Sequence, residues 1–336
     1  MRRRPLLLTG FTFLVASALL SLAVGASPLD LLTVLRALLG TPADSNHWAH
    51  AVVLDVRLPR VLLAIAIGAT SAQCGVVLQA LFRNALAEQS LLGISGGAAL
   101  AAAGWLVMAP LLQGAFALPP SFSLPLAALF GAALAAFVVI KLSHRGGLTD
   151  IATLLMVGIA INALAGAGIA LLQTLASDAA LRDLSIWFYG SLGRADWQQL
   201  AVGLPMLAFI ALWLPREARA LDALLLGEAE AAHLGVPVEA LKRRLLLLVA
   251  LAAAVSVALA GIIGFIGLIV PHLLRRVLGP GHQLLMPAAG LFGATLLLLA
   301  DTAARTLFAP LEVPVGVLTA LLGVPLFLIL LRRPSA

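Results

Sequence analysis

The 336-residue chain is 62% hydrophobic and only 11% charged, and its mean hydropathy is +1.09. A soluble protein of this length cannot bury so much apolar surface, so the composition excludes a soluble fold and predicts a polytopic membrane protein. Leu, Ala, Val and Gly dominate the chain, which favours membrane helices over the alternating strands of a membrane barrel. The formal net charge is +6, but the basic residues stand at the ends of apolar runs, a pattern that indicates membrane topology and argues against nucleic acid as a partner.

A membrane-spanning helix needs about 20 apolar residues, so the chain has room for about ten spans. The predicted spans are 6–25, 58–81, 93–112, 122–142, 151–175, 197–214, 242–260, 261–278, 284–302 and 313–331. Residues 242–278 are too long for one crossing, so we divide them at Gly261. The basic N-terminus and first apolar run resemble a signal peptide, but the length of the run and the many spans after it favour an uncleaved first span.

The basic residues predict the orientation of these spans. If the N-terminus is cytoplasmic and the spans alternate, fifteen of the 21 lysines and arginines lie on the cytoplasmic side and six on the outer side. This asymmetry satisfies the positive-inside rule. The sequence therefore predicts an all-α polytopic membrane protein, a single membrane domain over residues 1–336 with both termini cytoplasmic.

Residues 215–241 form the one long cytoplasmic connection in this arrangement. Gly227 and Gly235 divide it into two short helical pieces, and an apolar stripe alternates with acidic residues. Such amphipathic helices lie on a membrane surface or dock into a partner protein. The length and the two-helix layout make docking at least as favourable an interpretation as surface association.

The chain lacks the residues of several common chemistries. It has no Gly-rich phosphate loop ending in Lys-Ser or Lys-Thr, no paired histidine spacing for a metal and no Gly-x-Ser-x-Gly nucleophile elbow. It also lacks an evident ionisable residue near the middle of a span, where ion-coupled carriers keep their sites. We therefore expect no catalytic residue, no metal site and no cofactor on this chain, and an energy source in another subunit.

Residues 264–276, Gly-Phe-Ile-Gly-Leu-Ile-Val-Pro-His-Leu-Leu-Arg-Arg, are apolar but interrupted. Pro271 removes a backbone donor, so we expect a structural break here whose polar groups are satisfied by neighbouring protein or water. Arg275 and Arg276 are expected at the cytoplasmic face. For His272 a structural hydrogen bond is favoured over a ligand role.

Several stretches occur in order along nearly the whole chain: Arg57–Arg60, Gln79–Glu88, Leu92–Ala99, Gly264–Arg276, Ala300–Arg305 and Pro314–Pro325. Together they resemble the membrane permease subunits of ABC importers for iron–siderophores, haem and cobalamin, the FecCD-type permeases of type II importers. Ala85 departs from the pattern, because these permeases usually have proline after Arg-Asn.

The resemblance implies ten transmembrane helices per subunit and a homodimer with a pathway along its axis. It also implies two cytoplasmic ATPase subunits that hold ATP and Mg, a periplasmic substrate-binding protein, and alternating access in the inner membrane of a Gram-negative bacterium. Leu86–Glu88 and the overall pattern look more like haem importers. A ferric siderophore or cobalamin is the alternative cargo, and a stand-alone secondary carrier or a passive channel is the competing class.

The resemblance also assigns roles to residues. Arg57, Arg60 and Arg305 would meet acidic residues of the binding protein. Anchoring at the membrane interface is the alternative for the first two, and it is disfavoured because arginines on the outer face run against the charge rule. The coupling contact with the ATPase would involve Leu224, Gly227, Glu228, Ala231, His233 and Gly235. The pathway and its inner gate would involve Thr149, Ile151, Ala152, Leu155, Asn162 and Arg182. Asn162 has the alternative of bonding a neighbouring helix, and the aromatic residues near Arg182 fit either an interfacial belt or a flat apolar cargo.

Overall fold

A computed structural model describes residues 3–25, 27–40, 47–109, 120–145, 148–309 and 311–331. Residues 110–112 of the third predicted span and Arg332 and Arg333 lie outside this part. The described residues are nearly all helical, and their one sheet is a two-stranded antiparallel hairpin in which β1 (His144–Arg145) pairs with β2 (Leu148–Thr149). The all-α prediction is therefore confirmed.

Each predicted span overlaps a helix in the described chain. These helices are α1 (Arg3–Ala23), α4 (Leu58–Leu81), α5 (Ile94–Met108), α6 (Pro120–Ser143), α7 (Ile151–Leu175), α9 (Trp197–Trp213), α12 (Val238–Ala260), α13 (Ile266–Leu278), α14 (His282–Thr306) and α15 (Val315–Leu331). By length and composition, seven helices of the described chain can cross a membrane, and α5 and part of α15 are shorter apolar helices. The chain is thus a multi-pass membrane protein.

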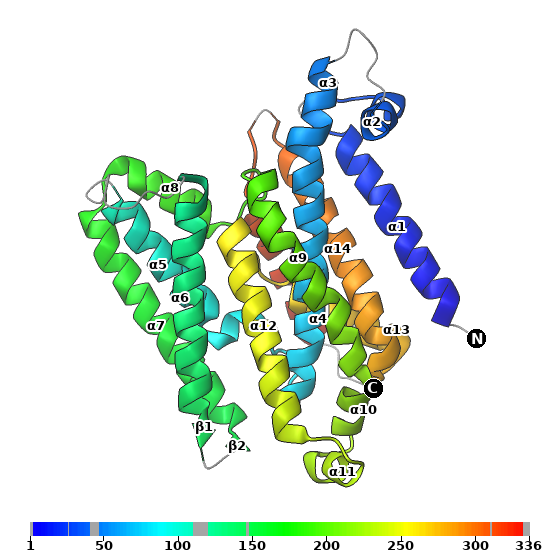
Figure 1. Cartoon of the computed structure of the whole chain (residues 1–336), viewed down its shortest axis with the longest axis vertical. Helices are drawn as coiled ribbons and strands as arrows, with labels where there is room; N and C mark the ends of the chain where they lie inside the picture. The colour runs from blue at the N-terminus through cyan, green and yellow to red at the C-terminus, as the bar shows by residue number, and fades with distance from the viewer. Residues whose placement is uncertain are drawn as a thin grey trace.

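Short helices connect the long ones at both ends of the molecule. They are α2 (Leu31–Leu38), α3 (His47–Ala51), the π-helix η1 (Val52–Arg57), the 3₁₀ segment η2 (Gln89–Leu92), α8 (Asp178–Phe188), the 3₁₀ segment η3 (Leu214–Glu217), α10 (Ala218–Leu224) and α11 (Glu228–His233). Figure 1 shows α2 and α3 at one end of the molecule, and α10, α11 and the β1–β2 hairpin at the other. The sequence predicted the two pieces at 215–241 but not the helices at the opposite end.

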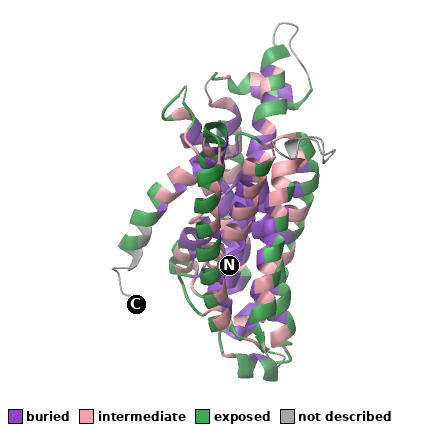
Figure 2. Cartoon of the chain, turned by 90° about the vertical axis from the view of Figure 1, so that its left-hand side faces the viewer, coloured by how far each residue is buried: buried purple, intermediate pink, exposed green. Residues whose placement is uncertain are grey.

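Helix α4 lies at the centre of the bundle, and most of its residues are buried. Figure 2 shows this buried centre between more exposed outer helices. Glycines allow neighbouring backbones to approach α4 closely, as helix packing in lipid requires. A Cβ on Gly68 would lie 2.4 Å from the carbonyl oxygen of Gly293 in α14, and one on Gly75 would lie 1.8 Å from that of Gly267 in α13.

The break near Pro271 lies earlier in the chain than predicted. Helix α13 continues through Pro271, and the irregular residues are 261–265, between Gly261 (φ +71°) and Phe265 (φ +70°). Pro271 has no N–H to give to Gly267 O four residues earlier, and the side chain of Gln79 donates to this oxygen at 3.2 Å instead. The expectation that neighbouring protein satisfies the freed group is confirmed.

We predict that Gly75→Ala destabilises the protein by at least about 3 kcal/mol, the upper end of overpacking costs, because its Cβ would meet backbone rather than a movable side chain. Gly166 in α7 is the matched control, because a Cβ there meets nothing within 4 Å. Thermal unfolding in detergent should show a large loss for Gly75→Ala and no loss for Gly166→Ala. Equal stability of the two variants would contradict the close approach of α4 and α13.

Candidate functional site

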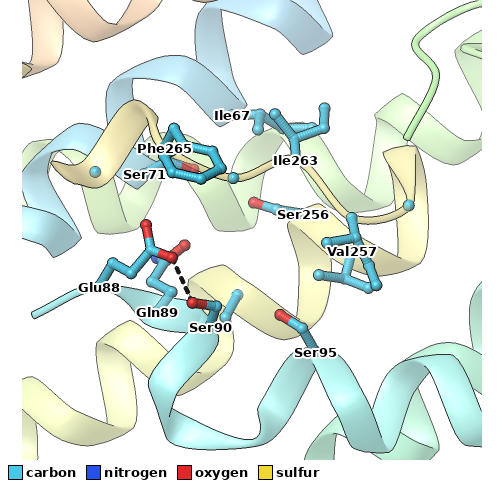
Figure 3. A pocket seen from close by; sticks show the side chains of 15 residues that line it. Ile67, Ser71, Glu88, Gln89, Ser90, Ser95, Ser256, Val257, Ile263 and Phe265 are labelled. Atoms are coloured by element: carbon cyan, nitrogen blue, oxygen red, sulfur yellow. Dashed lines mark hydrogen bonds between the residues drawn. The ribbon is translucent and has the colours of Figure 1, made fainter. Parts of the chain in front are cut away.

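A polar pocket of about 40 Å³ lies at the break between α12 and α13. Figure 3 shows that its lining comes from α4, from the loop and short helix before α5, from α5 itself and from residues 256–265. Its polar side chains are Ser71, Glu88, Gln89, Ser90, Ser95 and Ser256. The hydroxyl of Ser90 donates to the Glu88 carboxylate, whereas the buried Ser256 Oγ has no partner among the described residues. The volume is sufficient for ordered water.

Asn162, predicted on the pathway, is tied to the rim of this pocket. Its Nδ2 donates to the carbonyl oxygen of Ser90 at 2.9 Å, so it fastens α7 to η2. The hydrogen bond to a neighbouring element, one of the two alternatives, is therefore formed. Arg182 is far along the chain from this contact, exposed on α8, and its pathway role stays a prediction.

The predicted gate segment is the start of α7. The Asp150 carboxylate caps this helix, accepting from Ala152 N at 3.1 Å and Thr153 N at 3.3 Å. Ile151 and Leu155 are half-buried and Ala152 is exposed. The backbone N–H of Thr149 donates to Glu239 Oε2 of α12 at 2.9 Å. The segment is therefore attached to the first turn of α12.

Lys242 links this attachment to the segment predicted to couple with an ATPase. Its side chain is only 5% exposed, and its Nζ lies 3.0 Å from Glu239 of its own helix and 2.6 Å from Glu228 of α11. Sequence reasoning did not single out Lys242 or Glu239. The sequence did contain a signal: Lys242 stands at the start of an apolar run, where a helix is expected to be buried. A buried charge requires a carboxylate partner.

The six predicted coupling residues differ in exposure, and Gly227 is intermediate. Leu224 and Ala231 are buried, so their side chains support the segment from inside, and their part in coupling stays a prediction. Glu228, His233 and Gly235 are exposed on the surface of the molecule. Gly227 (φ +125°) and Gly235 (φ +84°) make turns that only glycine adopts readily. Leu225, which belongs to the apolar stripe read from the sequence, is exposed, and so are Leu226 and Leu234, which sequence reasoning missed.

The inner side of this segment is held by polar contacts as well. Asp222 of α10 accepts from the backbone N–H of His282 at 2.6 Å and lies 3.0 Å from its Nδ1. Glu217 accepts from Arg244 at 2.7 Å. Together with the Glu228–Lys242 pair, these contacts fix the two short helices to α12 and α14.

At the opposite end of the molecule, Arg60 joins three elements. Its guanidinium donates bidentate hydrogen bonds of 2.9–3.1 Å to the carboxylate of Asp301 in α14. Its third nitrogen lies 3.0 Å from Glu312, whose side chain is 53% exposed. Bidentate pairing of this kind fixes both position and orientation.

Arg57 and Arg305 hold the end of α1 against this group. Arg57 donates to the carbonyl oxygens of Leu22 at 2.6 Å and Ala23 at 3.0 Å, and also to Ser27 O. Carbonyls at the end of a helix lack partners within it, and Arg57 supplies the donors. Arg305 donates to the backbone oxygen and the hydroxyl of Ser21.

All three arginines are buried. Carboxylates and carbonyls of the same chain surround their guanidinium groups. Their role in docking a binding protein stays a prediction. His272 differs from expectation: its Nε2 is buried and has no hydrogen-bond partner among the described residues.

We predict that Asp301→Ala costs about 3–5 kcal/mol of stability, because it leaves the buried Arg60 without its main counter-ion. Glu312→Ala removes the exposed partner of the same arginine and should cost only about 0–1 kcal/mol. Unfolding midpoints of the two purified variants measure the difference. A Glu312 variant as unstable as the Asp301 variant would contradict the assigned roles.

Comparisons with known proteins agree with this architecture. The model of the FecCD transport family matches residues 13–333. The chain is 44% identical to the hemin transport system permease protein HmuU of Yersinia pestis, over 99% of this chain and 97% of that protein. It is 40% identical to the vitamin B12 import permease BtuC of Vibrio vulnificus (86% and 85% covered) and 36% identical to the iron(3+)-hydroxamate import permease FhuG of Bacillus subtilis (99% and 98% covered).

A solved structure has the same fold. The match is an inward-facing ABC transporter of the metal-chelate type, with a TM-score of 0.84 and 30% identity, covering 98% of this chain and 99% of that one. The family match covers nearly the whole sequence and the fold agrees over the same length. The chain therefore belongs to the FecCD transport family and is a transport permease.

Proposed function

We propose that this chain is the permease subunit of an ATP-driven importer that moves haem, or another iron chelate, from the periplasm to the cytoplasm by alternating access. The whole-length similarity to a hemin permease supports haem as the cargo. ATP and Mg belong to two partner ATPase subunits, and this chain holds no cofactor of its own. A periplasmic binding protein delivers the cargo.

The proposed setting is the bacterial inner membrane, with ten spans and both termini in the cytoplasm. The basic residues support this orientation by fifteen to six. The exposed large apolar residues of α7, such as Met156, Leu164 and Leu171, support a second copy of the chain along this helix. In this orientation α10, α11 and the β1–β2 hairpin face the cytoplasm.

One observation carries the coupling mechanism. Glu228 of α11, Lys242 and Glu239 of α12, and the backbone N–H of Thr149 form an unbroken series of contacts between 2.6 and 3.0 Å. It joins the helix that would contact the ATPase to the start of α7, where the inner gate is expected. Movement of α11 would therefore pull on the gate segment through the buried Lys242, because a buried charge separates from its carboxylate partners only at a large cost.

We expect Lys242→Met to uncouple the transporter. Because this change removes the link between Glu228 and Glu239, stimulation of ATP hydrolysis by the loaded binding protein should fall at least tenfold, while basal hydrolysis of the assembled complex persists. The measurement is ATPase activity and uptake in proteoliposomes.

Arg244→Met is the matched control for this experiment. Arg244 lies two residues away and pairs with Glu217, but its side chain is 46% exposed and outside the series. Normal stimulation in Lys242→Met would refute the proposed link. Loss of stimulation in both variants would show that breaking either contact between the 215–241 segment and α12 has the same effect, and would contradict a role specific to the Lys242 series.

The cargo is tested by the same reconstituted complex. Binding proteins loaded with haem, with ferric siderophore and with cobalamin are compared for their stimulation of ATP hydrolysis, and we expect haem to give the largest. Similarity to vitamin B12 and hydroxamate permeases supports the other two cargoes as alternatives. Uptake without the ATPase would instead identify a secondary carrier or a channel.

Docking of the binding protein on Arg57, Arg60 and Arg305 remains part of the proposal. Because the three guanidinium groups are engaged inside the chain, reversing their charge would also break the packing of α1 and α14. The exposed Glu312 offers a gentler route: Glu312→Gln releases one nitrogen of Arg60 and would strengthen docking at low salt if Arg60 receives an acidic residue.

A further inference from the structure

A groove on the outside of the bundle has the chemistry of a lipid site. It lies between α6 and α12 and has a volume of about 680 Å³. In Figure 1, α6 and α12 both lie on the side facing the viewer. Figure 2, turned by 90°, shows α15 projecting from the opposite face. The groove shares no lining residue with the pocket at the break between α12 and α13, so the two are separate.

The body of the groove is apolar. Leu246, Ala250 and Ala254, spaced four residues apart on α12, are buried and form its floor. Phe137 of α6 and Leu247 of α12 stand exposed at its walls, by 60% and 51%. A second apolar hollow of about 160 Å³ shares Leu129 with the groove and continues toward the start of α6. Together the two hollows form one long furrow parallel to the helices.

One end of the furrow is basic. Lys141, His144 and Arg243 line the groove at the end that carries the β1–β2 hairpin. Lys141 Nζ lies 5.5 Å from the centre of the Phe137 ring, and neither Lys141 nor Arg243 has an ion-pair partner in the described chain. Glu239, one turn before Arg243 on α12, is already bound by Lys242 and Thr149 N.

We propose that this furrow binds an anionic phospholipid, with its phosphate on Lys141 and Arg243 and an acyl chain along α12. Basic pockets between membrane helices on the cytoplasmic side recognise anionic head groups, and long basic side chains reach the interface from an apolar surface. Charge complementarity selects this occupant, because two unpaired cations end an otherwise apolar furrow. Thr149 lines the same mouth, so the head group contacts the predicted gate segment.

Native mass spectrometry of the purified full chain tests the proposal. Phosphatidylglycerol and phosphatidylcholine with identical chains are added in turn, and we expect the wild type to retain the anionic lipid at least fivefold better. The double variant K141Q/R243Q should lose this preference. The double variant R219Q/R276Q removes the same charge from exposed basic residues outside the groove and should keep it.

Two further measurements complete the test. Ala133→Trp places a large side chain on an exposed groove position and should reduce retention of both lipids without changing the two basic residues. Excess inorganic phosphate should not displace the lipid, because the acyl chain contributes to binding. Equal retention by both double variants, displacement by phosphate alone, or a shift of Ala133→Trp from dimer to monomer with lipid retention unchanged would overturn the proposal.

Discussion

The absence of water in a bilayer is the constraint on which the rest of this structure depends, because every buried polar group must find its partner within the protein. Pro271 shows how this works. It frees the carbonyl of Gly267, Gln79 of α4 donates to that oxygen, and the other end of the same amide accepts from Arg275. The glycine at position 75 lets α4 approach closely enough for these bonds. A sequence feature that looks like a helix breaker therefore acts as a connection between the central helix and its neighbour.

The same constraint accounts for the charged residues at the two ends. Arg60 with Asp301, and Lys242 with Glu228, are buried cations paired with a carboxylate from another helix, and Glu239 of its own helix is a second partner of Lys242. Unpaired burial of either would cost several kcal/mol, roughly the total margin of a typical domain. Such pairs hold helices in defined relative positions. They also allow the movement of one helix to be transmitted to the helix with which it is paired.

The sequence predicted the helices well where hydropathy alone decides them. The ranges 58–81 and 151–175 match α4 and α7, and two glycines correctly divided the 215–241 segment. It could not predict the partners of the buried arginines, because Arg60 and Asp301 are 241 residues apart and only the folded bundle brings them together. It also missed α2, α3 and α8, since short helices at a membrane surface depend on caps such as Asp30 and Ser177 rather than on an apolar run. The predicted position of the break at Pro271 was wrong for a related reason. A side chain from another helix satisfies the carbonyl that the proline leaves free, so α13 continues through it.

At the end of the molecule that carries α11 and the β1–β2 hairpin, basic residues that the positive-inside rule counts alike have different surroundings. Lys242 and Arg243 are adjacent in α12, yet one is buried between two carboxylates and the other is exposed without an ion-pair partner in the described chain. Successive residues of a helix point about 100° apart, so one side chain faces the protein interior and the other faces the groove. In the proposed coupling, Lys242 transmits force because its buried charge has no partner other than these carboxylates. Arg243 is available to a ligand because its charge has no ion-pair partner in the described chain. The groove beside it is apolar. The positive-inside pattern therefore serves two physical roles here, and the location of the nearest carboxylate decides which role each cation has.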